Sequence, residues 1–154
     1  ALTTGTRLAL APATDESRGL DRVLAQAPAA DTRPIRVVPG PQADHFGTDA
    51  LATLVSGNYR VSAEADRMGI RLLGPALVYQ GAPMISEGIP LGAVQVPPDG
   101  QPIVLLNDRQ TIGGYPRLGA LTPLALARLA QCLPGAQVRL RPVVQDVAQD
   151  QPAA

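Results

Sequence analysis

Proline and glycine recur so often in this chain that long helices have little room to form. The chain has 16 prolines and 15 glycines among 154 residues. Proline ends helices and is excluded from central strands, whereas glycine supplies the backbone conformations that tight turns need. This punctuation favours many short strands joined by turns over a helix bundle.

Short apolar runs bounded by turn residues predict the strands. Pro97, Pro98, Asp99 and Gly100 form a strong turn between two of these runs, which together resemble a hairpin. The predicted strands are residues 35–38, 59–61, 67–73, 93–96, 102–106 and 137–141.

Two short helices complete the predicted elements. Thr48 is placed to cap a helix over residues 49–56, with Gly57 directly after its end. Thr122 caps a second helix over residues 123–132. Strands and helices together predict a mainly β fold, a closed or nearly closed β-barrel with two short capped helices at its ends.

The chain has the length of one domain. Residues 1–34 are rich in small and polar side chains and are predicted to be a linker, or the remnant of a preceding half. Residues 35–143 hold the predicted barrel. Residues 144–154, rich in Gln, Asp, Ala and Pro, are predicted to be a disordered tail.

Charge and composition exclude several classes of function. The 13 basic and 13 acidic residues balance, and all the basic residues are arginines. Without a charge run, capture of nucleic acid or of an anionic membrane is not expected. Without lysine, a Schiff base on this chain is excluded. No apolar run approaches the roughly 18 residues of a membrane span, so we expect a cytoplasmic protein.

A lone histidine and a lone cysteine restrict metal and nucleophile chemistry. His45 and Cys132 cannot make a Cys/His zinc cluster by themselves, and no metal site is predicted. A GxSxG motif is also absent. His45 is better explained as a loop residue packed beside Phe46, and Cys132 as a small buried apolar residue.

Three carboxylates are the candidate catalytic groups: Glu87, Asp99 and Asp108. They lie at strand ends and in glycine-bounded loops, where scaffolds usually present functional side chains. An acid/base role requires one of them to lie in a cleft with a shifted pKa. The structural alternatives stay open: Asp99 closes its own turn, and Glu87 and Asp108 pair with arginines.

Amides, arginines and a glycine pair provide the candidate binding groups. A glutamine amide both donates and accepts hydrogen bonds and therefore complements an amide or ureido group. Gly113 and Gly114 are candidates for a backbone loop that approaches a ligand, although a plain turn explains them equally. The candidate substrate-binding side chains are Arg67, Gln95, Gln101, Arg109, Gln110, Tyr115 and Arg117.

Four blocks of sequence, in order, carry a resemblance to a known family. They lie within residues 36–46, 62–74, 85–102 and 108–117, and include Arg-Val-Val-Pro-Gly-Pro-Gln, Asp-Arg-Met-Gly-Ile-Arg-Leu and Gly-Gly-Tyr-Pro. They resemble the biotin-dependent carboxyltransferase-like family, which includes allophanate hydrolase subunit 2, the C subunit of 5-oxoprolinase and the carboxyltransferase domain of urea carboxylase. The chain is similar to the C-terminal half of such proteins. The resemblance implies a cyclophilin-like β-barrel.

The resemblance also implies three functions. The first is a subunit or domain of an ATP-dependent 5-oxoprolinase-type complex that opens 5-oxoproline to glutamate. Gln95, Asp99, Gln101 and Asp108 would then orient the amide, and an arginine would counter a carboxylate. The second is a carboxyltransferase domain that passes a carboxyl group from carboxybiotin to urea or a related amide. The third is a non-enzymatic regulatory partner.

Partners and cofactors follow from these alternatives. The expected partners are a sister subunit of the allophanate hydrolase subunit 1 type, a lactam-utilisation-type subunit and a small amide substrate. We expect no covalently bound cofactor on this chain, with ATP acting in the complex or carboxybiotin arriving from another domain. The isolated chain is expected to be inactive.

Overall fold

The computed structural model describes residues 4–7, 33–47 and 49–143. The chain divides into two units, Ala1–Asp31 and Thr32–Ala154, and the second holds every helix and strand of the described residues. The predicted linker over residues 1–34 falls mostly outside the described residues, and the predicted tail over 144–154 falls wholly outside them.

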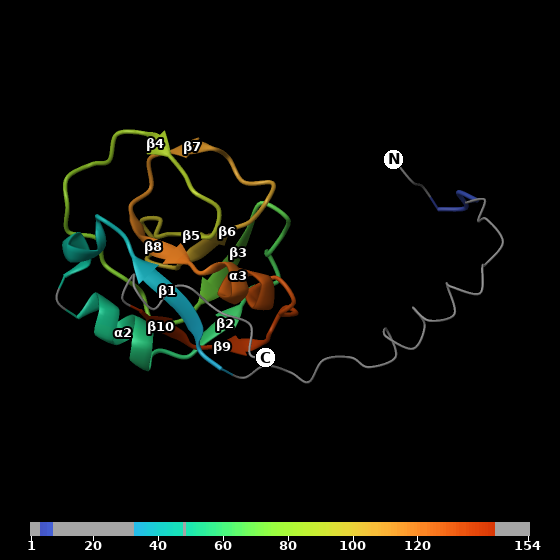
Figure 1. The fold of residues 1–154 in the computed structure, drawn as a ribbon, viewed down its shortest axis with the longest axis horizontal. Helices are drawn as coiled ribbons and strands as arrows, with labels where there is room; N and C mark the ends of the chain where they lie inside the picture. Colours follow the sequence, from blue (N-terminus) through green and yellow to red (C-terminus); the bar gives the residue numbers. More distant parts are fainter. Residues whose placement is uncertain (1–3, 8–32, 48, 144–154) are drawn as a thin grey trace. The chain divides into compact units, whose positions relative to one another are not determined.

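An eight-stranded sheet forms the body of the second unit (Figure 1). Its strands follow the order β10-β1-β8-β5-β6-β3-β2-β9, and a separate two-stranded ladder joins β4 to β7. The strands are β1 (Ile35–Pro39), β2 (Tyr59–Val61), β3 (Gly69–Leu73), β4 (Glu87–Gly88), β5 (Ala93–Gln95), β6 (Ile103–Leu105), β7 (Ile112–Gly113), β8 (Arg117–Leu121), β9 (Gln137–Val138) and β10 (Leu140–Pro142).

The sheet is nearly closed because its two outermost strands are consecutive in the chain. β9 pairs with β2, and β10 pairs in parallel with β1, with only Arg139 between β9 and β10. The Ile35 amide donates to the Arg139 carbonyl at 2.7 Å, which ties this junction to the first strand. The prediction of a mainly β, nearly closed barrel of the cyclophilin-like kind is confirmed.

Two short helices and one 3₁₀ turn accompany the barrel. α2 (Ala50–Ser56) lies by β10, α3 (Pro123–Leu129) lies by β1, and η1 (Ala43–Phe46) is the 3₁₀ turn (Figure 1). Each α-helix buries a leucine completely, Leu54 and Leu129. These join one apolar cluster with inward-facing residues of the strands, including Val37, Leu72 and Leu118. None of the helices among the described residues is long and apolar enough to cross a membrane.

The helix caps match the prediction only in part. Thr122 accepts a hydrogen bond from the Ala125 amide, as expected, but α3 ends at Leu129, three residues before the predicted end. Thr48 lies outside the described residues. Gly57 has a φ of −69°, so it does not adopt the left-handed conformation expected after a helix. It is confined instead by space, because a Cβ there would lie 2.7 Å from the Thr53 carbonyl oxygen.

β8 is the main element that the sequence did not predict. This strand lies at the centre of the sheet between β1 and β5. Its sequence Arg-Leu-Gly-Ala-Leu contains no β-branched residue and has a glycine at its middle. Gly119 is required because a Cβ there would lie 2.2 Å from the Val38 carbonyl oxygen. Close approach of two backbones therefore replaces strand propensity at this position.

Candidate functional site

The predicted site residues fall into three sets of contacts. Glu87, Gln95 and Arg117 belong to the first set, Asp99 and Gln101 to the second, and Arg67 and Asp108 to the third. The candidate residues therefore do not meet in one place: Glu87 lies on the ladder of β4 and β7, whereas Asp99 and Gln101 lie between β5 and β6.

The first set is built around the partly buried guanidinium of Arg117, at the start of β8. Its Nη2 lies 2.6 Å from Glu87 Oε1, and its Nη1 donates to the Gly88 carbonyl at 2.8 Å. Gln42 Nε2 donates to the same Glu87 oxygen at 2.9 Å. Arg117 therefore holds β4, and with it the β4–β7 ladder, against the barrel.

Gln95 completes this set, which we call the Arg117 cluster: Gln42, Glu87, Gln95 and Arg117. Gln95 is the cross-strand partner of Arg117 at a register shift between β5 and β8, and only 1% of its surface is exposed. A register shift of this kind re-aims side chains at the end of a ladder.

Among the residues that the structure describes, three buried polar atoms of the Arg117 cluster have no hydrogen-bond partner: Gln42 Oε1, Gln95 Nε2 and Arg117 Nε. A buried polar atom without a partner costs about 1–3 kcal/mol of desolvation. Two of the atoms are donors and one is an acceptor.

Gly113 brings the β7 backbone close to Gln95. A Cβ at Gly113 would lie 3.5 Å from Gln95 Nε2 and 2.7 Å from Ile89 Cδ1. Gly114 lies beside Ser86, whose Oγ would be 3.5 Å from a Cβ at that position. Gly113 thus lies against the cluster, whereas Gly114 lies beside Ser86, and a backbone-binding role of the pair stays a prediction.

The remaining candidates of this region lie at its margin. Arg109 donates from Nε to the Ile89 carbonyl at 3.2 Å and from Nη1 to the Leu106 carbonyl at 3.5 Å, so it braces two loops. Gln110 and Tyr115 are exposed.

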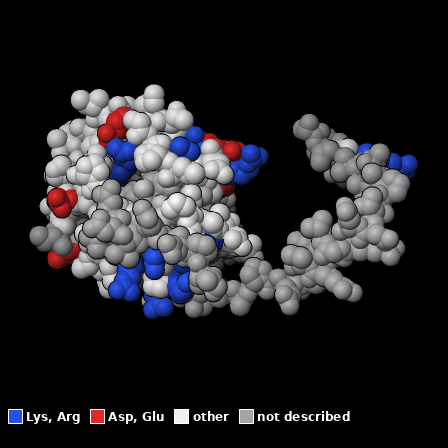
Figure 2. Space-filling model, in the orientation of Figure 1, with Lys and Arg blue, Asp and Glu red and all other residues white. Residues whose placement is uncertain are grey.

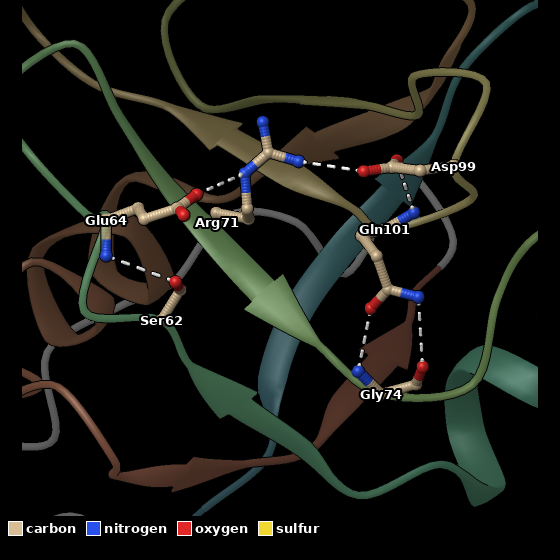
Figure 3. Close-up of polar contacts among 6 residues, drawn as sticks. All are labelled: Ser62, Glu64, Arg71, Gly74, Asp99 and Gln101. Carbon is tan, nitrogen blue, oxygen red and sulfur yellow. Dashed lines mark hydrogen bonds and ion pairs between the residues drawn. The ribbon is translucent and has the colours of Figure 1, made fainter.

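The second set, which we call the Asp99 cluster, satisfies its polar groups internally (Figure 3). It comprises Ser62, Glu64, Arg71, Gly74, Asp99 and Gln101. Asp99 Oδ1 accepts from the Gln101 amide at 3.0 Å, and Oδ2 accepts from Arg71 Nη1 at 3.0 Å. The structural alternative for Asp99, closure of its own turn, is therefore what the geometry shows.

The Gln101 side chain is engaged in the same way. Its Oε1 accepts from the Gly74 amide at 2.9 Å, and its Nε2 donates to the Gly74 carbonyl at 3.2 Å (Figure 3). The side-chain amide thus bonds to both the N–H and the C=O of one residue, as a neighbouring strand does in a β-ladder. These bonds connect the residue after β3 to the hairpin turn. A role of Asp99 or Gln101 in chemistry stays a prediction.

The third set is an ion pair at the edge of an apolar hollow. Arg67 Nη2 lies 2.7 Å from Asp108 Oδ2, and both side chains are largely exposed. A surface pair of this kind contributes little stability. The hollow has a volume of about 610 Å³ and is lined mainly by leucine and alanine side chains of β8, α3 and the loops beside them.

Five residues of these sets were not predicted as site residues: Gln42, Ser62, Glu64, Arg71 and Gly74. Gln42 lies within the sequence block 36–46, and its place beside two turn prolines was the available signal. Arg71 alternates with buried residues of β3, which marks an outward side chain but not its partners. Gln42 bonds to Glu87, 45 residues away, and Arg71 bonds to Asp99, 28 residues away, which no local pattern reveals.

The lone histidine and cysteine take structural positions. His45 is part of η1, with its ring 6.1 Å from the ring of Tyr79. Burial raises the pKa of the Cys132 thiol, against the opposing effect of nearby Arg128, so the nucleophilic thiolate is disfavoured. No group of three metal-ligating side chains occurs within the described part of the chain.

Comparison with known proteins identifies the class of this chain. The family model described as carboxyltransferase domain, subdomain A and B, matches residues 1–142. The chain therefore belongs to that family. The resemblance drawn from the four sequence blocks is confirmed.

Particular relatives lie within this family. The C subunit of 5-oxoprolinase from Escherichia coli (strain K12) is 40% identical over 98 residues, which are 63% of this chain and 32% of the relative. The protein of the same name from Haemophilus influenzae is 36% identical over 110 residues, 71% of this chain and 36% of the relative. The chain thus spans about a third of the length of these relatives.

Solved structures agree with the fold. The crystal structure of TTHA0988 has a TM-score of 0.63 at 42% identity, covering 75% of this chain and 22% of its own. Urea carboxylase of Kluyveromyces lactis has a TM-score of 0.69 at 22% identity, covering 75% of this chain and 11% of its own. The second likeness concerns the fold alone.

Proposed function

We propose that this chain is part of a 5-oxoprolinase-type amide-hydrolysing complex and that its Arg117 cluster receives the substrate. The observation that carries the proposal is the set of unpaired atoms Gln42 Oε1, Gln95 Nε2 and Arg117 Nε. 5-Oxoproline presents a lactam carbonyl, a lactam N–H and a carboxylate. The two donors suit the carbonyl and the carboxylate, and the acceptor suits the N–H.

Access to the cluster requires the β4–β7 ladder to move. This ladder joins only Glu87 to Gly113 and Gly88 to Ile112, and Ile112 is 65% exposed. So short a ladder, with Ile112 on the surface, belongs to the low-stability end of a fold. Its opening would admit a small substrate, and its closure would exclude water from the amide.

Glu87 is the candidate acid/base of this site. It lies on the moving ladder and is bonded to both Arg117 and Gln42, so it would reposition when the ladder opens. ATP would act elsewhere in the complex. The partners would be a sister subunit of the allophanate hydrolase subunit 1 type and a lactam-utilisation-type subunit. The names of the relatives, which are themselves subunits, support an assembly of this kind.

The test is an assay of 5-oxoproline-dependent ATP hydrolysis after purification with the neighbouring subunits. Activity that requires this chain supports the proposal, as does a 5-oxoproline-induced shift of the Gln95 side-chain amide resonances by NMR. Activity that persists without the chain contradicts it.

A second function is favoured by the name of the family. A urea or ureido group offers the same carbonyl and N–H pattern to the Arg117 cluster, and the family model is that of a carboxyltransferase domain. Carboxybiotin would have to come from another domain, because this chain has no lysine to carry biotin. Binding of urea but not of 5-oxoproline would favour this function. Binding of neither, with retained capture of the sister subunit, would favour a regulatory partner.

A further inference from the structure

The junction that closes the barrel carries arginines on its outer face. Arg139 and Arg141 are exposed, whereas Leu140 between them is buried. Residues that alternate in this way along a strand point to the same face of the sheet. The two guanidinium groups therefore stand on one surface.

A third arginine extends this surface along β2. Arg60 is exposed between two buried neighbours, and its register partner on β9 is Gln137, two residues before Arg139. Register partners point to the same face of a sheet. The three exposed arginines of the junction, Arg60, Arg139 and Arg141, are called the arginine row; Arg36, the half-buried register partner of Arg141 on β1, lies beside them and is engaged in a contact of its own. Basic side chains gather in this region, over β9 and β10, in the lower part of Figure 2.

The arginine row lacks opposing carboxylates within the described residues. The ion pairs among the described residues engage Arg67, Arg71 and Arg117. None of them engages Arg60, Arg139 or Arg141. Like charges that stand close together on one face of a sheet repel each other. No carboxylate among the described residues of the sheet offsets this repulsion, so the surface is suited to bind an anionic group of another molecule.

The spacing of the row favours an extended polypeptide. Arg139 and Arg141 stand two residues apart on one face, a separation of about 7 Å along a strand. Carboxylates at alternate positions of an extended segment have the same spacing and take bidentate bonds from guanidinium groups. Nucleic acid fits less well, because the chain has no lysine and zero net charge, and Tyr59, the aromatic residue nearest the row in sequence, is buried.

A small hollow adjoins the row. It has a volume of about 360 Å³ and lies between Arg60, Gln137 and the residues around Gly74. We propose that the arginine row, with this hollow, docks an extended acidic segment of a partner protein whose carboxylates alternate along the strand direction. This surface is separate from the Arg117 cluster, so it does not depend on the proposed function.

The experiment measures binding of a fluorescent peptide of four Glu-Ser repeats to the full chain by anisotropy. We expect saturable binding that weakens at least tenfold in the double variant Arg139→Glu/Arg141→Glu and that is lost in about 0.5 M salt. Arg7→Glu, an exposed arginine outside the barrel unit, is the matched control and should change the affinity less than twofold. Circular dichroism checks that each variant is folded.

Three results would overturn the proposal. The first is equal binding by the double variant and the Arg7→Glu control. The second is tighter binding of a short DNA duplex than of the peptide, which would assign the row to nucleic acid. The third is at least tenfold tighter peptide binding by Asp146→Asn/Asp150→Asn, which would show that carboxylates of this chain already occupy the row. A peptide with its glutamates in one block should bind more weakly than the alternating one.

Discussion

The Arg117 cluster and the Asp99 cluster use the same residue types for opposite purposes. Each combines an arginine, a carboxylate and a glutamine from distant parts of the chain. In the Asp99 cluster the glutamine and the carboxylate bond to backbone and to Arg71. In the Arg117 cluster three buried polar atoms have no partner within the described ranges of the chain. Satisfied groups stabilise a fold, whereas unsatisfied ones are retained at a cost that ligand binding can offset.

The sharpest test of this difference replaces each arginine by lysine. Arg117→Lys should lower 5-oxoproline-dependent ATP hydrolysis of the complex by about 100-fold, because the single nitrogen of a lysine ammonium cannot reproduce the planar spread of guanidinium nitrogens that holds Glu87 and Gly88 and leaves Nε as a separate donor. Arg71→Lys is the matched control and should change activity less than twofold. Equal losses in the two variants would remove the distinction between the clusters.

Glutamine to methionine is the next test, since it removes the amide while keeping the length of the side chain. Gln95→Met should leave the free energy of unfolding unchanged or raise it by about 1 kcal/mol, because it removes a buried unpaired donor. Activity should nevertheless fall by about tenfold. Gln101→Met should do the reverse, with lower stability and unchanged activity per folded molecule. Urea denaturation and the ATPase assay measure the two effects.

Truncation of the Asp99 cluster should affect stability alone. Asp99→Ala with Gln101→Ala removes the bonds to Gly74 and Arg71, which are exposed, so we expect a loss of about 1 kcal/mol in the free energy of unfolding. Activity of the folded complex should be unchanged. A loss of activity at unchanged stability would instead unite the two clusters in one site.

Alkaline pH should weaken the side of the barrel that carries the Asp99 cluster. Burial raises the pKa of Tyr59 to about 12, and its hydroxyl donates to the Pro75 carbonyl beside Gly74. The folded state thus favours the neutral phenol, so its contribution is complete below the ordinary tyrosine pKa of about 10 and is lost as the pH rises toward 12. The urea midpoint should fall over this range. Tyr59→Phe should remove that part of the pH dependence.

The sequence correctly predicted those elements in which the residues locally favour the conformation that they adopt. The turn at residues 97–100 closes as expected, with the Gly100 amide bonded to the Pro97 carbonyl at 2.9 Å and a φ of 74° at Gly100. Thr122 likewise caps α3. β8 was missed because the reason for Gly119 is its close contact with the backbone of Val38. Val38 is distant in sequence and lies beside Gly119 only in the folded sheet.

The candidate site likewise has features that the sequence predicted and features that only the folded structure determined. Residue types and their order were enough to predict the family, the mainly β class and the crowding of glutamines, carboxylates and arginines within residues 85–117. Which of these side chains meet depended on the folded barrel. It gave Asp99 and Gln101 backbone partners, and it placed Gln95 beside Arg117 with an unpaired amide. A side chain's hydrogen-bonding capacity follows from its type, whereas its satisfaction depends on which distant segments the barrel brings within about 3 Å.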